Sequence, residues 1–351
     1  MSRSRLAVAI STALLAGAAS AFAFSPAAQA GPGESAAASY GDTTGVGVHN
    51  AYEKDKYEYF ADALDSGASL LELDVWTNVV GKGWRVSHGN PTGNDNNCEN
   101  AASAEELRSN ERDQSLDGCL ADMRAWHDAH PGHPPVLIKV EMKDGFYDKA
   151  DRGPDELDAL LGEKLGDALF RPSDVTGDKA TLDEAVGSTG WPERKAMEGK
   201  FLIELIPGTL EESNPADDLW TDEEYATHLK DLAAKGALGE AGAFPAVHGA
   251  EKGDPRTERY DEELRPWFVV FDGDASAFTG EDGIDTAWYQ DHGYLTIMTD
   301  AHKVAPEIDG TEPSEQEATD RVKQLAADHA SFATADWYPL PKVLSTVLPR
   351  G

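Results

Sequence analysis

Residues 46–89 read VGVHNAYEKDKYEYFADALDSGASLLELDVWTNVVGKGWRVSHG and contain three short apolar runs that carry polar side chains at or near their ends. The first run ends at His49 and Asn50, and the third ends at His88. In the middle run, apolar and acidic residues alternate. Because alternation with a period of two is typical of β-structure, this stretch predicts three strands with polar groups at their ends.

The middle run carries two carboxylates on one face. Glu72 and Asp74 are two residues apart, and alternate residues of a strand point the same way. Two like charges held side by side are unfavourable unless a cation lies near them. The pair therefore predicts a metal site.

Strand-like and helix-like segments alternate along the chain. Apolar runs of strand length cover residues 46–49, 70–76, 136–141, 201–206, 244–248, 267–272, 295–299 and 332–334. Segments with apolar residues at helical spacing include residues 57–65, 116–127, 157–165, 223–234 and 315–329. The alternation predicts an α/β fold with a parallel sheet, and eight repeats predict a closed (β/α)8 TIM barrel. A turn signal at residues 79–84 predicts an additional hairpin in the second repeat.

The first 30 residues have the parts of a secretory signal peptide. Arg3 and Arg5 form a basic start, residues 6–24 are apolar, and Ala28-Gln29-Ala30 is a cleavage site of the A-x-A type. A membrane anchor is the alternative, but the run is rich in Ala and Gly, and no later segment is apolar enough to span a bilayer. We predict a secreted protein that is cleaved near Ala30, with a single domain over residues 31–351.

The chain is strongly acidic, with 64 Asp and Glu against 30 Lys and Arg and a formal net charge of -34. Such a charge argues against a nucleic-acid partner and against electrostatic docking on anionic membranes. The surface of a secreted, soluble protein accounts for the excess of acidic residues.

Cys98 and Cys119 are the two cysteines, and 20 residues of a polar region separate them. In a secreted protein such a pair predicts a disulfide. A disulfide that closes a loop of this length stabilises the fold by roughly 3 kcal/mol in the chain-entropy model. A metal site is the alternative, and the lack of a nearby histidine pair argues against it.

Glu141 ends the third strand-like run, and in a parallel barrel the carboxyl ends of the strands meet at one mouth. Asn50, Glu72, Asp74 and Glu141 would then offer only oxygen ligands to the same site. Sets of oxygen ligands favour Ca2+ or Mg2+, and Ca2+ accepts an irregular, carboxylate-rich shell more readily. We therefore expect bound calcium.

The two histidines of the opening stretch, His49 and His88, are then free for proton transfer. Beside a divalent cation, a pair of imidazoles can take a proton from a nucleophilic hydroxyl and return one to a leaving alkoxide. The cation offsets the charge of the phosphorane. This combination of groups predicts the cleavage of a phosphodiester.

Four motifs resemble those of the calcium-dependent phosphatidylinositol-specific phospholipase C family: HN at 49–50, ELDVW at 72–76, SHG at 87–89, and the glutamate that ends the third barrel strand. The chain is similar to the secreted, bacterial, single-domain type within the PLC-like phosphodiesterase superfamily. The resemblance implies that residues 31–351 form a catalytic TIM barrel. It implies that His49 and His88 are catalytic and that the calcium ligands are Asn50, Glu72, Asp74 and Glu141.

The resemblance also implies a reaction. The inositol 2-hydroxyl attacks the neighbouring phosphate, which releases diacylglycerol and forms an inositol 1,2-cyclic phosphate that water can open to inositol 1-phosphate. His88 would chiefly stabilise the phosphorane, and His49 would protonate the leaving group. The base for the 2-hydroxyl stays open between an imidazole and a carboxylate, with Glu72 and Glu141 as candidates. We expect a monomer that acts on phosphatidylinositol or glycerophosphoinositol, with transient contact to a membrane surface.

One departure from the family bears on the substrate. Eukaryotic members carry lysines on the fourth barrel strand that contact ring phosphates, whereas this chain has Glu204 and Ile206 there. An acidic residue should repel a 4- or 5-phosphate, which favours unphosphorylated phosphatidylinositol. Asp300 follows the seventh strand-like run, so it is a second candidate for contact with the substrate.

Two other functions remain open. A glycerophosphodiester phosphodiesterase shares the barrel and a similar E-x-D pair, but its first motif usually continues His-Arg-Gly, whereas this chain has His49-Asn50-Ala51. A non-catalytic secreted module that binds calcium or inositides would need neither His49 nor His88, so the presence of both argues against it.

Overall fold

The computed structural model describes residues 37–214, 219–280 and 283–351. The predicted signal peptide at residues 1–30 lies outside the described residues and stays a prediction.

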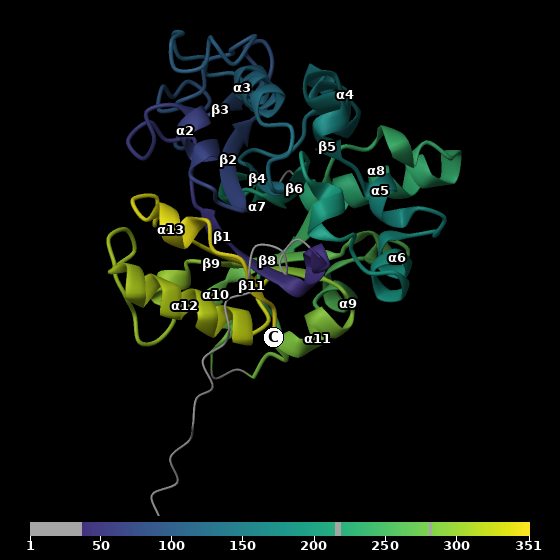
Figure 1. Cartoon of the computed structure of the whole chain (residues 1–351). Coiled ribbons are helices and arrows are strands. Elements are labelled where there is room, and N and C mark those ends of the chain that lie inside the picture. The colour runs from purple at the N-terminus through teal and green to yellow at the C-terminus, as the bar shows by residue number, and fades with distance from the viewer. Residues whose placement is uncertain (1–36, 215–218, 281–282) are drawn as a thin grey trace, which may run out of the picture.

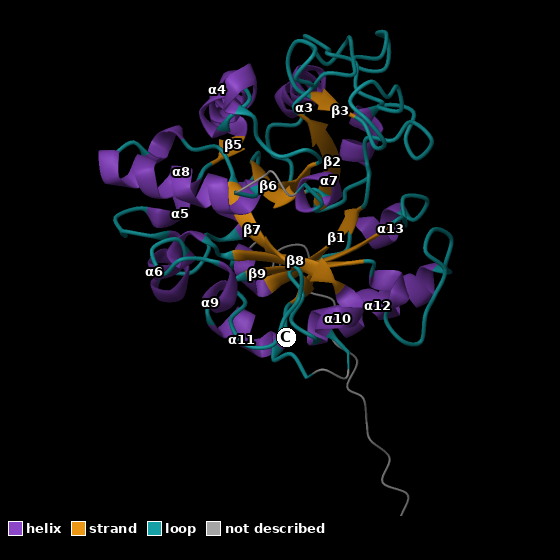
Figure 2. Ribbon diagram, turned by 180° about the vertical axis from the view of Figure 1, so that it is seen from behind, coloured by secondary structure: helices purple, strands orange, loops and turns teal. Residues whose placement is uncertain are grey.

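Eight parallel strands form a closed barrel at the centre of the molecule (Figures 1 and 2). They are β1 (Thr43–Val48), β2 (Leu70–Trp76), β4 (Val136–Met142), β6 (Phe201–Pro207), β7 (Phe244–His248), β8 (Val270–Asp274), β9 (Leu295–Thr299) and β10 (Phe332–Ala335). Each strand pairs with the next where the structure describes it, and β10 pairs with β1 to close the ring. The predicted TIM barrel is confirmed.

Helices surround the barrel, as the purple ribbons outside the orange strands in Figure 2 show. The α-helices are α2 (Phe60–Asp65), α3 (Leu116–Ala129), α4 (Pro154–Leu165), α5 (Pro172–Thr176), α6 (Leu182–Ser188), α7 (Thr209–Glu212), α8 (Thr221–Lys235), α9 (Arg256–Arg259), α10 (Ala275–Phe278), α11 (Thr286–Asp291), α12 (Glu315–Ala327) and α13 (Pro341–Leu344). Seven 3-10 turns are η1 (Tyr40–Asp42), η2 (Asp148–Ala150), η3 (Gly166–Ala168), η4 (Arg194–Met197), η5 (Leu238–Glu240), η6 (Arg265–Trp267) and η7 (Ala301–Lys303). Within the described ranges, no helix has the length and apolar character needed to cross a bilayer.

Capping residues set where the long helices begin. Ser115 accepts a hydrogen bond from the N–H of Gly118 at the start of α3. Ser314 and Glu317 form a reciprocal capping box at the start of α12, and Pro154 opens α4. The first helical turn leaves backbone N–H groups without partners. Side chains at the caps accept hydrogen bonds from these groups, and a proline at the first helical position has no N–H to satisfy.

Three short strands extend the sheet. β3 (Arg85–Val86) pairs antiparallel with β2, which confirms the predicted hairpin. β5 (Leu169–Phe170) lies beside β6. β11 (Leu348–Pro349) pairs antiparallel with β1, so the yellow C-terminal segment meets the purple N-terminal strand in Figure 1.

The predicted strands agree with the observed ones to within a few residues, and the difference at the start of the sixth has a local cause. The prediction began at residue 267, whereas β8 begins at Val270. Arg265–Trp267 forms the 3-10 turn η6 instead, with Pro266 in its first turn. Proline has no N–H for a strand ladder, and its fixed φ suits the first turn of a helix.

A disulfide joins Cys98 to Cys119, as predicted. It ties the long irregular connection after β3 to the first turn of α3. This connection lies over the same part of the barrel as β2 and its hairpin (Figure 1).

Candidate active site

Two rows of side chains cross neighbouring strands near the carboxyl end of the barrel. The strand register on β2, β4 and β6 gives a lower row of Glu72, Lys139 and Glu204 and an upper row of Asp74, Glu141 and Ile206. Side chains two residues apart on a strand face the same side, so both rows face the barrel interior. The upper row lies nearer the mouth because the strands run towards it.

Three carboxylates come together at this mouth. One oxygen from each of Glu72, Asp74 and Glu141 lies within 4.8 Å of the other two. Both oxygens of Asp74 are buried, and apart from an ion pair with Lys143 they have no hydrogen-bond partner among the described residues. Burial, with the charges of Glu141 and Glu72, raises the pKa of Asp74 to about 7. A crowded set of oxygen ligands with an unsatisfied buried carboxylate fits Ca2+.

Asn50 lies against this cluster at the end of β1. Its backbone N–H donates a hydrogen bond to Oε2 of Glu72 over 3.1 Å. Its φ of 49° is in the left-handed region, which asparagine adopts more readily than most residues. Asn50 is buried, so the structure places the fourth predicted ligand beside the other three.

Two lysines neutralise the carboxylates. Nζ of Lys139 lies 2.8 Å from Oδ2 of Asp272 and 3.5 Å from Oε1 of Glu72. Nζ of Lys143 lies 2.9 Å from Oε1 of Glu141. Burial disfavours the charged forms of both Lys139 and Glu72. The charges of Asp272 and Glu72 nevertheless raise the pKa of Lys139. The charge of Lys139 likewise lowers the pKa of Glu72. The lower row therefore carries paired charges inside the barrel.

His49 follows β1 at the rim of the cluster, and a carboxylate orients its ring. Nδ1 of His49 lies 3.2 Å from Oδ1 of Asp336, which follows β10, and Nε2 lies 3.8 Å from Oε2 of Glu72. Lys56 donates hydrogen bonds to the carbonyl of His49 and to Asp336. Burial lowers the pKa of His49, but the hydrogen bond that Nδ1 donates to Asp336 and the charge of Glu72 outweigh it, so the pKa is raised. The imidazole can hold or release a proton beside the carboxylates.

His88 occupies a different environment from His49. It lies on the exposed bend after β3, where its backbone N–H donates to Oδ2 of Asp95. It is not among the residues that line the pocket described next. The structure brings the ring of His49 to the carboxylates, and His88 follows Ser87, whose N–H donates a hydrogen bond to the carbonyl of Asp74.

A pocket opens directly over the two rows. Its lining comes from all eight barrel strands and the residues that follow them: His49, Glu72, Lys139, Glu141, Ile206, Pro207, Thr209, His248, Asp272, Thr299, Asp300 and Thr334. Hydroxyl, carboxylate and imidazole groups dominate this wall. Such a lining suits a ligand with several hydroxyl groups.

Of the two predicted substrate contacts, one lines the pocket and the other does not. Asp300 lines the pocket, as expected for a residue that follows a barrel strand. Glu204 does not: it is 1% exposed, it lies in the lower row beneath the mouth, and Ile206 takes the pocket position. Burial and the charge of Asp272 raise the pKa of Glu204 well above its ordinary value. The prediction that Glu204 faces a ring phosphate is therefore corrected.

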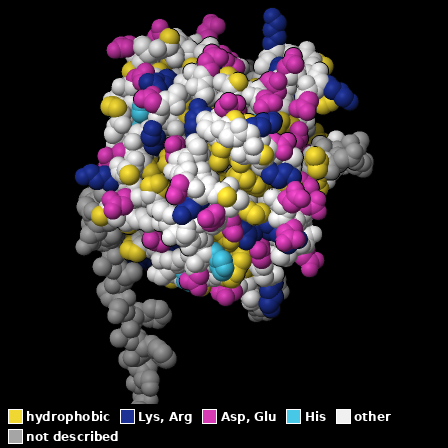
Figure 3. Space-filling view, turned by 90° about the vertical axis from the view of Figure 1, so that its right-hand side faces the viewer, with side chains coloured by type: hydrophobic (Ala, Val, Ile, Leu, Met, Phe, Trp, Pro, Cys, Tyr) yellow, Lys and Arg dark blue, Asp and Glu magenta, His cyan; other side chains and the backbone are white. Residues whose placement is uncertain are grey.

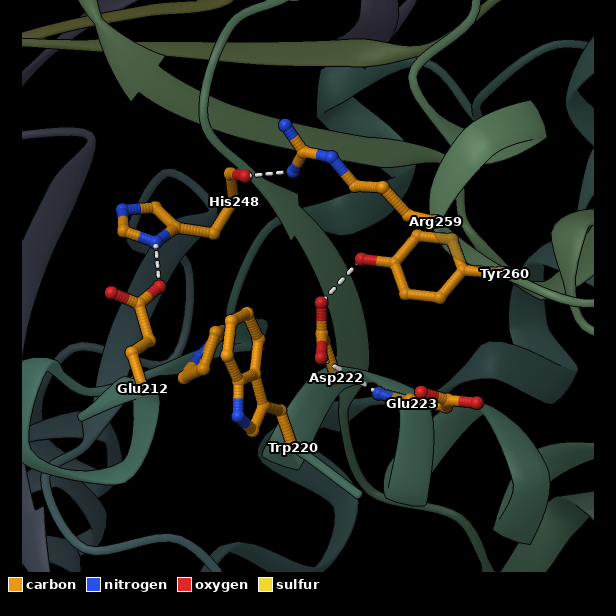
Figure 4. A pocket seen from close by; sticks show the side chains of 8 residues that line it. Glu212, Trp220, Asp222, Glu223, His248, Arg259 and Tyr260 are labelled. Atoms are coloured by element: carbon orange, nitrogen blue, oxygen red, sulfur yellow. Dashed lines mark hydrogen bonds and ion pairs between the residues drawn. The ribbon is translucent and has the colours of Figure 1, made fainter. Parts of the chain in front are cut away.

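Sequence reasoning missed several groups of the site. Lys139 was read as part of an apolar strand, although a charge inside such a strand needs a buried partner. His248 ends a barrel strand, and the same position led to the identification of Glu141. His248 was overlooked because no motif contains it. Its ring contacts Glu212 and lines both the main pocket and a second hollow beside it (Figure 4).

Comparison with known proteins gives a consistent result. The family model of Ca2+-dependent phosphoinositide phospholipase C matches residues 49–228. A Ca2+-dependent phosphatidylinositol-specific phospholipase C from Streptomyces antibioticus is 67% identical, with a TM-score of 0.88 over 90% of this chain and 100% of that chain. A calcium-dependent phosphoinositol-specific phospholipase C from a Pseudomonas species is 19% identical, with a TM-score of 0.62 over 90% of this chain and 96% of that chain, and this likeness concerns the fold alone. No curated protein matches the chain.

Proposed function

Because the chain belongs to the Ca2+-dependent phosphoinositide phospholipase C family, we propose that it is a calcium-dependent phosphodiesterase that cleaves phosphatidylinositol. One observation carries the proposal. The carboxylates of Glu72, Asp74 and Glu141 meet at the barrel mouth beside an imidazole that a further carboxylate orients. This arrangement combines a cation site with a proton-transfer group at a polar pocket.

Asn50, Glu72, Asp74 and Glu141 are the proposed calcium ligands. The burial of Asp74 and the spacing of the three carboxylates support this assignment. When bound, calcium would lower the pKa of the inositol 2-hydroxyl and offset the charge of the phosphorane. The protein supplies the fixed ligand geometry, since Asn50 holds Glu72 through its backbone N–H.

His49 is the proposed acid that protonates the diacylglycerol oxygen. Asp336 accepts a hydrogen bond at Nδ1, which leaves Nε2 directed towards the carboxylate cluster. A raised pKa favours the protonated ring, as an acid requires. The 2-hydroxyl would attack the adjacent phosphate and give the 1,2-cyclic product, which water can open. Glu72 or Glu141 is the proposed base.

His88 remains a proposed catalytic residue on sequence grounds, because it completes the SHG motif. Ser87, the residue before it, donates its N–H to the carbonyl of Asp74, so the backbone at His88 lies beside the strand that carries two proposed ligands. A His88→Ala variant tests this role: a fall in kcat with unchanged calcium affinity supports it, and unchanged kcat rejects it.

The predicted signal peptide bears on the compartment in which the enzyme acts. We propose that it is secreted after cleavage near Ala30 and that residues 31–351 form one catalytic domain that acts as a monomer.

Exposed large apolar side chains occur after three adjacent strands: Val79 and Val80 after β2, Tyr147 after β4, and Leu210, Leu219 and Trp220 after β6. These side chains support transient contact with a lipid surface. Carboxylates mix with basic groups over the face in Figure 3, which suits apolar rather than electrostatic contact.

Product analysis separates the proposal from its nearest rival. Phosphatidylinositol and glycerophosphoinositol are incubated with the protein, with Ca2+ or with a chelator, and followed by phosphorus NMR. Calcium-dependent formation of a cyclic phosphate supports the phospholipase. A glycerophosphodiester phosphodiesterase would release an acyclic phosphomonoester directly. No turnover of either substrate would reject both enzymes and favour a binding module.

A further inference from the structure

His248 is the last residue of β7, and its register partner on β8 is Asp272. Both residues line the pocket above the carboxylate cluster. β7 stands two places along the ring from β4, which carries Glu141. His248 therefore belongs to a part of the wall that the proposed calcium ligands do not supply.

The imidazole of His248 is held in one orientation. Nδ1 lies 3.0 Å from Oε1 of Glu212, the last residue of α7. The guanidinium of Arg259 donates a hydrogen bond to the carbonyl of His248, so the backbone is fixed as well. Figure 4 shows both contacts, and it shows the second ring nitrogen on the side turned away from Glu212. Nε2 is thus left for a ligand while Nδ1 is engaged.

The neighbours of His248 indicate which ligand chemistry it can serve. Asp272, Thr299 and Asp300 share its pocket, and Glu212 lies behind it. A hydroxyl both donates and accepts, so it pairs with Nε2 whether the ring is neutral or protonated. A phosphate pairs only with the protonated ring, and the surrounding carboxylates would repel it. The wall therefore suits a hydroxyl.

We propose that His248 is a specificity-determining residue, which hydrogen-bonds a ring hydroxyl of the inositol head group through Nε2, and that Glu212 positions it. This assignment rests on the proposed function, because it takes inositol as the ligand. The hydroxyl in question is one remote from the phosphate, since the phosphate lies at the calcium ligands. Loss of this contact weakens binding of the head group without removing a group that reacts.

Steady-state kinetics on soluble glycerophosphoinositol at saturating Ca2+ test the proposal. His248→Asn retains a polar atom near the Nδ1 position for Glu212 and loses Nε2, so KM rises about 3- to 10-fold while kcat stays within about 2-fold. His248→Gln places an amide near the Nε2 position and recovers part of the loss. His228→Asn is the matched control, because His228 also pairs with a carboxylate but lies on α8 away from the pocket. It leaves KM unchanged.

Deoxy analogues of the substrate, each without one ring hydroxyl, complete the test. For one analogue the wild-type protein and His248→Asn have the same KM, because the partner hydroxyl is already missing. An unchanged KM for His248→Asn on glycerophosphoinositol overturns the proposal, and so does the same KM ratio with every analogue. If the wild-type protein does not cleave glycerophosphoinositol or phosphatidylinositol, the proposed function itself fails, and the inference falls with it.

Discussion

Nζ of Lys143 lies 3.1 Å from Oδ2 of Asp74. The same ammonium lies 2.9 Å from Oε1 of Glu141, so one lysine contacts two of the three carboxylates that we assign to calcium. Lys143 follows β4 directly, and its backbone N–H is bonded to the carbonyl of Val75. The backbone is therefore fixed, while a flexible side chain carries the charge.

This relationship predicts that Lys143 competes with calcium for Asp74 and Glu141. We expect Lys143→Met to tighten calcium binding by about tenfold, since the ion no longer displaces an ammonium. Isothermal titration calorimetry with Ca2+ measures the change without reference to turnover. Lys342→Met, at an exposed ion pair with Glu315, is the control and leaves the affinity unchanged. Weaker calcium binding by Lys143→Met would show that the lysine supports the site instead.

Asp336 holds the ring of His49 through Nδ1, so a change at Asp336 should alter proton transfer by His49. Replacing Asp336 by Asn keeps the side-chain size but removes the charge that favours the protonated ring. We expect kcat to fall about 100-fold, within the range typical of a misdirected general acid. Calcium affinity should stay within about twofold, because Asp336 contacts no proposed ligand except through His49. A parallel loss of calcium binding would assign Asp336 to the metal site.

Lys139 is fully buried between carboxylates, so its removal should destabilise the barrel. Lys139→Met leaves Asp272 and Glu72 without their partner, and breaking a buried pair in this way costs about 3–5 kcal/mol. Urea unfolding with a chelator present measures the loss. Lys164→Met at the partly exposed pair with Asp117 should cost less than about 1 kcal/mol. Equal costs for the two variants would mean that Lys139 is not needed for charge balance.

The sequence predicted the barrel because apolar runs of strand length alternate with helix-like segments and recur eight times. A second rule, that polar residues at strand ends lie at the barrel mouth, supplied the site residues. The same rule found Glu141 and Asp300. It could not show how deep each polar residue lies, and Glu204 was placed at the mouth although it lies one row below. Nor could it pair groups from distant strands: Asp336 and His49 are 287 residues apart and meet only when β10 closes against β1.

The burial of Glu204 changes what is expected of it. Burial and the charge of Asp272 raise the pKa of Glu204 and so favour its neutral form, for which Glu204→Gln is a nearly isosteric replacement. We expect the ratio of kcat/KM for phosphatidylinositol and its bisphosphate to stay within about twofold of wild type. Ile206→Lys places a cation at the pocket wall and should shift the ratio towards the bisphosphate. A large shift caused by Glu204→Gln would restore the prediction that this residue repels ring phosphates.

His228 predicts a pH dependence of stability that is separate from catalysis. Nε2 of His228 on α8 lies 2.8 Å from Oδ2 of Asp158 on α4. Burial opposes the charged ring, but the hydrogen bond to Asp158 and its charge prevail, so the pKa of His228 is raised in the folded protein. The folded state then binds more protons than the unfolded state, whose histidine pKa is about 6.5. The stabilisation is therefore fully present below about pH 6.5 and is lost as the pH rises through the folded pKa.

The comparison of wild type with His228→Asn isolates this effect. We expect the difference in unfolding free energy to be largest near pH 6 and to shrink towards pH 8, as measured by urea unfolding at each pH. His292→Asn, at the exposed end of α11, is the matched control and should give a difference that does not vary with pH in this way. A difference for His228→Asn that grows with pH would have the wrong sign, because it would require a ring held neutral by burial. A constant difference would mean that His228 contributes packing between α4 and α8 and no charge.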